Sequence, residues 1–199
     1  MTLEMDASDC SASSATATLD SAALPRPSID ALWRALAAVP DPEIPVVSII
    51  ELGILRGIEW DSTDPTTLIV RVTPTYSGCP ATEMIATLIR EALAAVGLAH
   101  LRLETRLAPA WTTDWVTTEG KRKLREFGIA PPDGLRPISE CVAIDIIGIS
   151  PLRRSGVAVV CPRCDSERTQ LVSQFGSTAC KAQYRCLDCR EPFDYFKPH

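Results

Sequence analysis

The chain has 199 residues, of which 46% are hydrophobic, and its formal net charge is −5. This length accommodates one domain and a small appendage, and the apolar content is enough for an ordinary buried core. The sequence contains no apolar run of about 18 residues, which excludes a membrane-spanning helix, and its acidic first residues do not fit a secretory signal peptide. We therefore expect a cytoplasmic protein.

Positive charge is concentrated near the C-terminus. Residues 151–199 carry eight Lys or Arg and five Asp or Glu, whereas the preceding residues carry 12 and 20. An acidic main body is a poor general binder of polyanions. We therefore do not expect nucleic acid as a partner.

The first half of the chain predicts a helix and a braced loop. Residues 1–27 are rich in Ala, Ser and Thr without a sustained period, which is typical of a disordered tail. Ser28 is a suitable cap for a helix with apolar residues at helical spacing, and Pro40 ends it. The sequence Asp-Pro-Glu-Ile-Pro at 41–45 then predicts a stiff loop that carries Asp41 and Glu43.

The elements that follow mix strands and helices. Residues 54–60 and 67–73 predict a hairpin, 81–96 a helix ended by Gly97, and 101–107 a third strand. Residues 111–127 predict a shorter helix, interrupted at Gly120. The order α-β-β-α-β-α favours an α+β fold, a two-layer sandwich with its helices on one face of the sheet. We assign this domain to residues 28–128, a linker with a candidate strand at 141–147 to 129–156, and a last module to 157–199.

Four cysteines in the last module predict a metal site. They form two C-x₂-C pairs, Cys161 with Cys164 and Cys186 with Cys189. Two such turns supply the four thiolates of a tetrahedral zinc site, and the 157–199 module then reads as a zinc ribbon whose hairpin arms lie near 170–173 and 183–185. Disulfides are the alternative, which the absence of secretory features disfavours. Loss of this metal is expected to unfold the ribbon and to spare the first domain.

Cys79 is the leading candidate for a functional thiol. Pro80 suits the first position of a helix, so Cys79 is predicted to be its exposed N-cap. The unpaired amides and the helix dipole would then lower the pKa of this thiol and favour the thiolate. The alternative is a small capping residue without reactivity.

Two further pairs of residues are candidates. Asp41 and Glu43 would bind a metal or a partner's cation, or else serve only the chemistry of the turn. Cys180 and Lys181 lie between the two cysteine pairs, in a segment predicted to form the tip of the ribbon hairpin. A thiol beside a cation suggests a functional tip, and an ordinary turn is the alternative.

Several of these motifs resemble a known family. The loop at 41–45, Glu-Leu-Gly-Ile-Leu at 51–55 and Thr-Pro-Thr-Tyr-Ser-Gly-Cys-Pro at 73–80 are similar to the iron–sulfur-assembly domain found in SufT and in the eukaryotic cytosolic targeting complex. The cysteine pairs and Phe-Gly-Ser-Thr-Ala-Cys-Lys-Ala at 175–182 narrow the resemblance to the PaaD family, which accompanies the phenylacetyl-CoA epoxidase of phenylacetate degradation.

The resemblance implies a non-catalytic maturation factor for that multicomponent monooxygenase. Its partners would be the reductase or oxygenase components, and it would assist assembly of an iron–sulfur or di-iron centre. The family's functional cysteine corresponds to Cys79, which would hold iron or an iron–sulfur cluster transiently, and its acidic loop corresponds to Asp41 and Glu43. A homodimer that brings two such thiolates together is a further hypothesis.

Three other functions stay open at this point. A structural or electron-transfer subunit would hold iron, rather than zinc, at the four-cysteine site. A nucleic-acid-binding ribbon lacks the basic, aromatic-interleaved strand that such modules use. A thiol-dependent enzyme lacks a visible general base, because the only histidines are His100 and His199.

Overall fold

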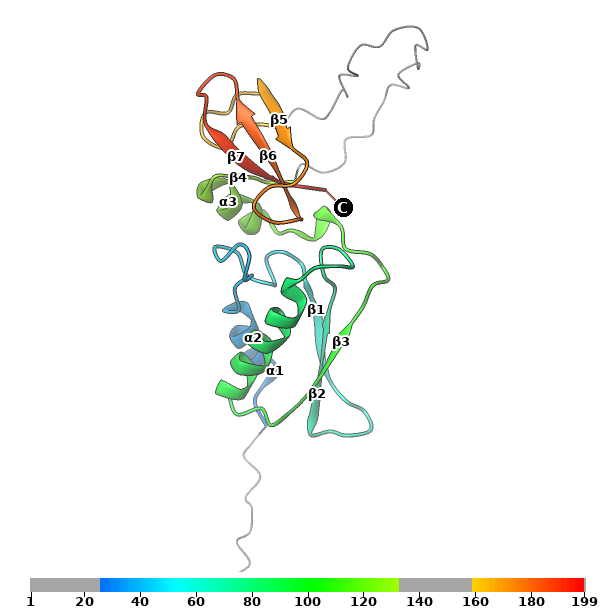
Figure 1. Ribbon diagram of the computed structural model, residues 1–199. Helices are drawn as coiled ribbons and strands as arrows, with labels where there is room; N and C mark the ends of the chain where they lie inside the picture. The colour runs from blue at the N-terminus through cyan, green and yellow to red at the C-terminus, as the bar shows by residue number, and fades with distance from the viewer. Residues whose placement is uncertain (1–25, 133–158, 199) are drawn as a thin grey trace, which may run out of the picture.

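The computed structural model describes residues 26–132 and 159–198, and every structural statement below concerns these residues (Figure 1). Most of the predicted tail, most of the predicted linker with its candidate strand at 141–147, and Cys10, Cys141 and His199 lie outside the described residues. Within the described part, no helix is long and apolar enough to cross a bilayer.

The first domain consists of a three-stranded sheet and two helices. Its elements are α1 (Ile29–Ala37), β1 (Leu55–Trp60), β2 (Thr67–Val72), α2 (Ala81–Ala95) and β3 (His100–Thr105). The sheet order is β1-β2-β3, with β1 antiparallel and β3 parallel to the central β2. Both helices lie on one face of the sheet (Figure 1), so the predicted two-layer α+β sandwich is confirmed.

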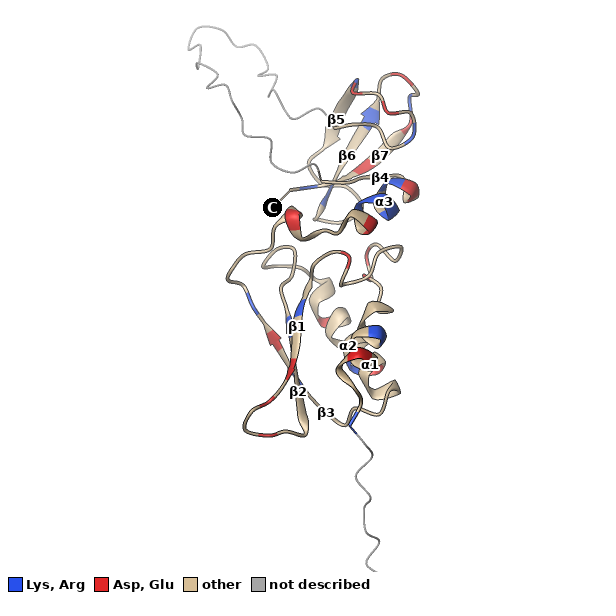
Figure 2. Ribbon diagram, turned by 180° about the vertical axis from the view of Figure 1, so that it is seen from behind, with Lys and Arg blue, Asp and Glu red and all other residues tan. Residues whose placement is uncertain are grey.

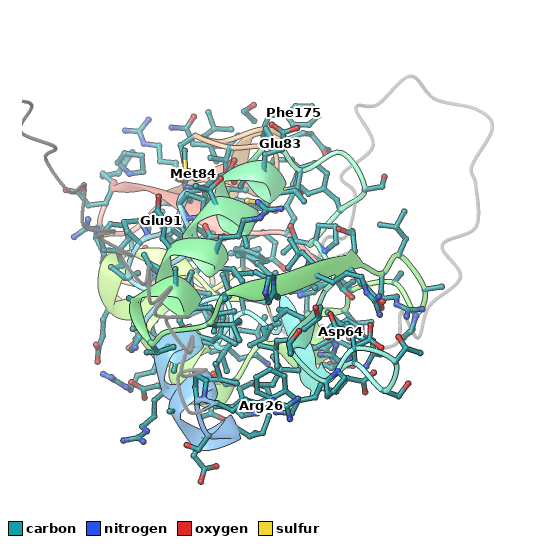
Figure 3. All side chains as sticks on the ribbon, turned by 90° about the horizontal axis from the view of Figure 1, so that it is seen from below. Arg26, Asp64, Glu83, Met84, Glu91 and Phe175 are labelled. Carbon is teal, nitrogen blue, oxygen red and sulfur yellow. The ribbon has the colours of Figure 1, made fainter. Side chains whose placement is uncertain are left out.

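The helices bury the stripes that their sequences predict. Ser28 caps α1, where its hydroxyl accepts the N–H of Ala31 at 3.2 Å, and Leu32 and Leu36 are fully buried one turn apart. On α2 the buried stripe consists of Ile85, Ile89 and Leu93. The outward face of α2 carries Glu83, Met84 and Glu91 (Figure 3), and the Met84 side chain is 53% exposed.

The backbone at Gly53 shows why the motif at 51–55 has glycine in its centre. Its φ is +69°, and a Cβ at this position would lie 2.5 Å from the Cβ of Trp115. Only glycine satisfies both the left-handed backbone and this close approach. The motif therefore fixes how the chain enters β1 beneath the segment that precedes the third helix.

The second sheet forms the ribbon. The remaining elements are η1 (Thr113–Trp115), α3 (Thr118–Phe127), β4 (Ile129–Ala130), β5 (Thr169–Ser173), β6 (Lys181–Cys186) and β7 (Pro192–Phe196), and the strand order is β4-β7-β6-β5. The predicted hairpin arms are β5 and β6, which pair antiparallel. The predicted interruption of the third helix at Gly120 is wrong, because the break lies at Val116 and Thr117, and Thr117 caps α3.

The predicted start of the linker at residue 129 is also wrong. Ile129 and Ala130 form β4, which pairs parallel with Asp194 and Tyr195 of β7. A two-residue strand is too short to show a hydrophobic period, so no local pattern marks it. The ribbon therefore takes its fourth strand from a segment that precedes the cysteine pairs by about thirty residues.

Two sets of contacts join the ribbon to the first domain. The helix α3 lies between the two sheets (Figure 1) and carries a concentration of Lys and Arg (Figure 2). Its Lys123 Nζ lies 2.6 Å from Glu51 of the first domain, and its Arg125 pairs with Asp165 of the ribbon. At the end of β7, Phe196 is 1% exposed and belongs to the core of the first domain, where its ring centroid lies 5.9 Å from that of Trp111.

Candidate functional site

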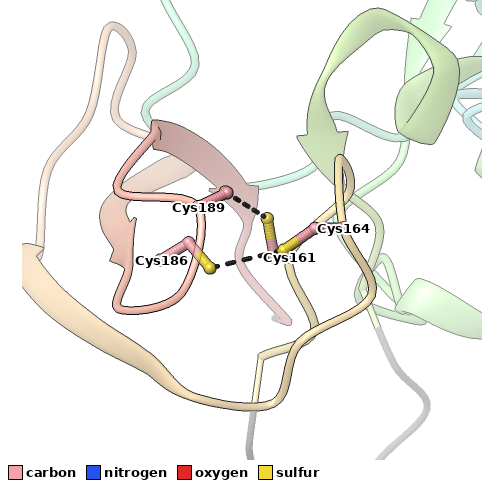
Figure 4. Close-up of side chains that lie close together, drawn as sticks. All are labelled: Cys161, Cys164, Cys186 and Cys189. Atoms are coloured by element: carbon pink, nitrogen blue, oxygen red, sulfur yellow. Dashed lines mark hydrogen bonds between the residues drawn. The ribbon is translucent and has the colours of Figure 1, made fainter.

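The four predicted ligands of the ribbon converge. Cys161 and Cys164 lie on the turn that precedes β5, Cys186 ends β6, and Cys189 lies on the turn before β7 (Figure 4). The sulfurs of Cys161 and Cys189 are 3.8 Å apart, those of Cys164 and Cys186 are 3.5 Å apart, and all four lie within 4.8 Å of one another. A tetrahedral zinc with Zn–S bonds of about 2.3 Å needs sulfurs about 3.8 Å apart, so this arrangement fits zinc.

The two cysteine turns share one backbone conformation. The N–H of Cys161 donates to Ser166 O at 2.9 Å, and the N–H of Cys186 donates to Glu191 O at 2.9 Å. The residue after each second cysteine is left-handed, with φ of 61° at Asp165 and 68° at Arg190. Two equivalent turns thus face each other across the metal position.

Backbone amides of one turn favour the thiolate form. Burial alone would raise the pKa of Cys186, but hydrogen bonds from the backbone N–H groups of Cys189 and Asp188 outweigh it and lower this pKa to about 6. The six cysteines among the described residues are all free, so the alternative of disulfides is wrong for them. A full set of four sulfurs leaves no open coordination position, which is typical of a structural site.

Four of the other candidate residues, Asp41, Glu43, Cys79 and Cys180, meet in a second place, a small pocket between the first domain and the ribbon tip. The polar part of its wall comes from Asp41, Glu43, Thr75, Cys79, Thr82 and Cys180, and Ile44, Ile85 and Phe196 are among its apolar lining residues. Cys79 and Cys180, which lie 101 positions apart in the sequence, therefore line one cavity.

Two predictions for Cys79 are wrong: its position as the exposed N-cap of the helix and the lowering of its pKa. The helix α2 begins at Ala81 with Pro80 at its N-cap, so Cys79 lies one residue before the cap, and it is partly buried. Burial raises the pKa of Cys79 above its ordinary value, and the charges of Glu43 and Asp41 add to the rise. Hydrogen bonds from the Ala81 N–H and from Thr82 act in the opposite direction but do not compensate. The sequence predicts where the helix starts, but it does not indicate that the ribbon covers this start and buries Cys79.

The two carboxylates of the acidic loop have different roles. Asp41 is buried, and its Oδ1 accepts the N–H groups of Glu43 at 2.9 Å and Ile44 at 2.8 Å. Asp41 therefore holds the loop in shape, which is the turn role that the sequence left open, and burial raises its pKa despite these bonds. Glu43 also lines the pocket, and its Oε2 accepts a hydrogen bond from the thiol of Cys180 at 3.5 Å.

The ribbon tip is turned inward and holds Cys180 in place. Cys180 is 4% exposed, its carbonyl accepts the N–H of Lys197 at 3.0 Å, and Thr178 Oγ1 lies 3.0 Å from its sulfur. A Cβ on Gly176 would lie 2.8 Å from Asp194 Oδ1, so the tip closes only with glycine there. Burial, followed by the charge of Glu43, raises the pKa of Cys180 to about 11.

Lys181 does not lie free beside the thiol as the sequence suggested. It is 5% exposed, and its Nζ lies 3.6 Å from Asp194 Oδ2. Asp194 also accepts the hydroxyl of Ser177 at 2.8 Å. The cation therefore braces the tip from within, and its charge is largely balanced by Asp194.

Sequence reasoning missed Phe196 as a wall of this pocket. Tyr195 and Phe196 are consecutive buried aromatic residues on one strand, and successive side chains on a strand point to opposite faces. Tyr195 packs in the core of the ribbon and Phe196 in that of the first domain. This pair of aromatic residues was the available signal that β7 is buried on both faces.

Both pocket thiols should react slowly with alkylating reagents at neutral pH. The pKa of Cys79 is raised and that of Cys180 is about 11, so each is protonated at pH 7 and the thiolate fraction grows as the pH rises. We expect the iodoacetamide rate at Cys180, followed by peptide mapping, to keep increasing up to about pH 11. In urea, where the protein is unfolded, the alkylation rates of both cysteines should depend on pH as expected for an ordinary thiol with a pKa of about 8.5. A plateau below pH 7 in the folded protein would contradict this.

Two family models match the chain. Residues 29–99 match the model described as iron–sulfur cluster assembly protein, and residues 150–197 match the PaaD zinc beta ribbon domain. The second match covers the four converging sulfurs and Cys180, and the first covers Cys79 and the acidic loop.

The chain is also similar to proteins of known sequence or structure. It is 46% identical over 171 residues to an Escherichia coli K12 protein named as one subunit of a putative 1,2-phenylacetyl-CoA epoxidase, across 86% of this chain and 93% of that one. A domain of unknown function, DUF59, from Bacillus anthracis is 24% identical over 48% of this chain and 89% of its own, with a TM-score of 0.43. A conserved hypothetical protein from Thermotoga maritima is 25% identical over 50% of this chain and 95% of its own, with a TM-score of 0.42.

Proposed function

The chain belongs to the PaaD family of 1,2-phenylacetyl-CoA epoxidase components, and we propose that it serves this multicomponent monooxygenase as a non-catalytic maturation factor. Its task would be to help assemble the iron–sulfur or di-iron centre of another component. Its partners are then the reductase or oxygenase subunits, in the cytoplasm. The match of residues 29–99 to an iron–sulfur cluster assembly model supports this task.

The observation that carries the proposal is the pocket in which Cys79, Cys180 and Glu43 meet. Thiolates suit iron and other soft or borderline metals, and a carboxylate is a common further ligand. No histidine is among the described residues that line this pocket, so the usual general base is missing there. Such a set of side chains is suited to hold and release a metal rather than to catalyse epoxidation.

The ribbon has a different role in this proposal. Its four sulfurs close the coordination sphere of one metal, so it supports the structure and positions the tip that carries Cys180. An accessory electron-transfer subunit would instead require iron in this site, and the test below distinguishes these two roles.

The test is the metal content of the other epoxidase components. They would be produced together with the wild-type chain, with Cys79→Ser, with Ser77→Ala as a matched control at an exposed position of the same segment, or without this protein. We expect iron content and epoxidation activity of the purified components to fall several-fold in the absence of the protein and with Cys79→Ser, and to be normal with Ser77→Ala. The metals and acid-labile sulfide of each component are measured.

Two outcomes would overturn the proposal. Fully iron-loaded, active components made without this protein would exclude a maturation role. Iron-loaded components that become active only when the purified protein is added back would instead favour the structural or electron-transfer subunit. In that case visible absorption of the protein as isolated would show iron in the four-cysteine site.

A further inference from the structure

We propose, on the basis of the maturation function above, that Cys79, Cys180 and Glu43 together bind a single ferrous ion at the junction of the first domain and the ribbon. In this site the ribbon adds a ligand to the thiol of the first domain, and the cargo is one metal ion rather than a preformed cluster.

Three separate parts of the chain supply the side chains. Glu43 lies on the loop between α1 and β1, Cys79 on the segment before α2, and Cys180 on the turn between β5 and β6. The thiol of Cys180 already donates to Glu43 Oε2 at 3.5 Å, across 137 residues of sequence, and Cys79 lines the same cavity. The electrostatic influence of Glu43 on both thiols reflects this proximity.

The size of the cavity favours one ion. Its enclosed space is about 20 Å³, and a single water needs about 10–15 Å³. A cluster of two irons and two sulfides is several times larger and would require the tip to move away. Among the described residues, the group whose ligand atoms all lie within 4.8 Å of one another consists of Cys161, Cys164, Cys186 and Cys189. The side chains of Cys79, Cys180 and Glu43 are therefore arranged more loosely than the ribbon cysteines. A modest closure around the ion is thus expected.

The charges around the cavity favour a cation. Asp41 and Glu43 line it from the acidic loop. Tyr76 lies nearby, on the segment before α2, where burial and then the neighbouring Cys79 raise its pKa to about 12. Tyr76 therefore stays neutral, and Lys181 of the ribbon, the described residue whose positive charge acts on both Asp41 and Cys180, is paired with Asp194.

Binding exchanges protons for the metal. Cysteine ligates a metal as the thiolate, so a ferrous ion that takes both sulfurs displaces two thiol protons to solvent, and Glu43 supplies an oxygen. Three protein ligands also leave a position open for the acceptor, in contrast to the closed ribbon site.

The test uses the full chain with its ribbon zinc in place and with Cys10→Ser and Cys141→Ser, so that Cys79 and Cys180 are the only thiols outside the ribbon site. Ferrous iron is titrated without oxygen, with and without sulfide, and iron, zinc and sulfide per chain are measured after desalting. We expect one iron per chain, retained zinc and no need for sulfide. Because loss of a supporting residue near a metal costs about 10–100-fold in affinity, Cys79→Ser, Cys180→Ser and Glu43→Gln should each weaken binding at least tenfold.

Glu83→Gln is the matched control for Glu43→Gln, because Glu83 projects from the outward face of α2 (Figure 3). Unchanged iron affinity in Cys180→Ser would overturn the shared site, and a requirement for sulfide with two irons per chain would overturn the single ion. If iron fails to bind here while Cys79→Ser still depletes the epoxidase of iron, the maturation function stands without this site. If iron binds as expected but the epoxidase is fully loaded without this protein, the site stands and the maturation function is wrong.

Discussion

Replacing Cys186 by serine is expected to release the ribbon metal and to lower the stability of both parts of the molecule. Cys186 is buried among the four converging sulfurs, and structural zinc sites contribute apparent binding free energies of about 10–16 kcal/mol at pH 7. A module of about 40 residues rarely folds without such a metal. The ribbon should therefore unfold, as the sequence alone already indicated.

The structure changes the expectation that loss of the ribbon metal leaves the first domain unaffected. Cys180 and Phe196 belong to the ribbon but are buried in the core cluster of the first domain. All four tryptophans precede the ribbon in the sequence, so the urea transition of their fluorescence reports the first domain. In Cys186→Ser this transition should move to lower urea, and Cys180→Ser, the matched control, should keep one zinc per chain. One equivalent of zinc retained by Cys186→Ser would show that the ligands are assigned incorrectly.

The second large effect is expected from Phe196→Ala. The Phe196 ring is 1% exposed and packs on Trp111, whose Nε1 donates to Leu52 O at 2.9 Å. Removal of a buried phenylalanine ring costs about 3–5 kcal/mol, because apolar contacts are lost and a cavity stays behind. We expect a loss of this size in the free energy of unfolding measured by tryptophan fluorescence, with the ribbon zinc still bound.

Phe127→Ala is the control for this substitution. Phe127 ends α3 and is 55% exposed, so its removal should change the free energy of unfolding by only about 0.5 kcal/mol. Equal effects of the two substitutions would mean that Phe196 does not connect the ribbon to the first domain. Zinc analysis of both variants distinguishes lost packing from lost metal.

The three strands of the first sheet and the hairpin of the second were predictable because their signals are local. The C-x₂-C pairs define the ribbon turns through spacing alone, and local patterns mark α1, α2 and the strands β1, β2, β3, β5 and β6 within about two residues, whereas β7 was not predicted. The order of these elements then leaves few topologies for the first domain. The two-residue strand β4 carries no period, which is why the sequence assigned it to a linker.

The pocket was not predictable because it depends on how the parts meet. Cys79 and Cys180 were each identified as candidates, but no pattern indicates that the ribbon tip turns inward until Cys180 lies against Glu43. The prediction that the pKa of Cys79 is lowered was wrong for the same reason. A helix start in water lowers the pKa of a thiol, whereas a helix start covered by a second module raises it by burial.

The strand β7 has a consequence for how the protein is made. Among the described residues it is the last strand in sequence order, yet it pairs with β4 on one side and with β6 on the other, and its Phe196 packs in the core of the first domain. Domains often fold in order as they emerge during synthesis. Here neither the ribbon sheet nor the core of the first domain reaches its final packing until residue 196 has left the ribosome. A nascent or truncated chain without β7 therefore exposes the apolar surface that Phe196 would cover, together with Cys79.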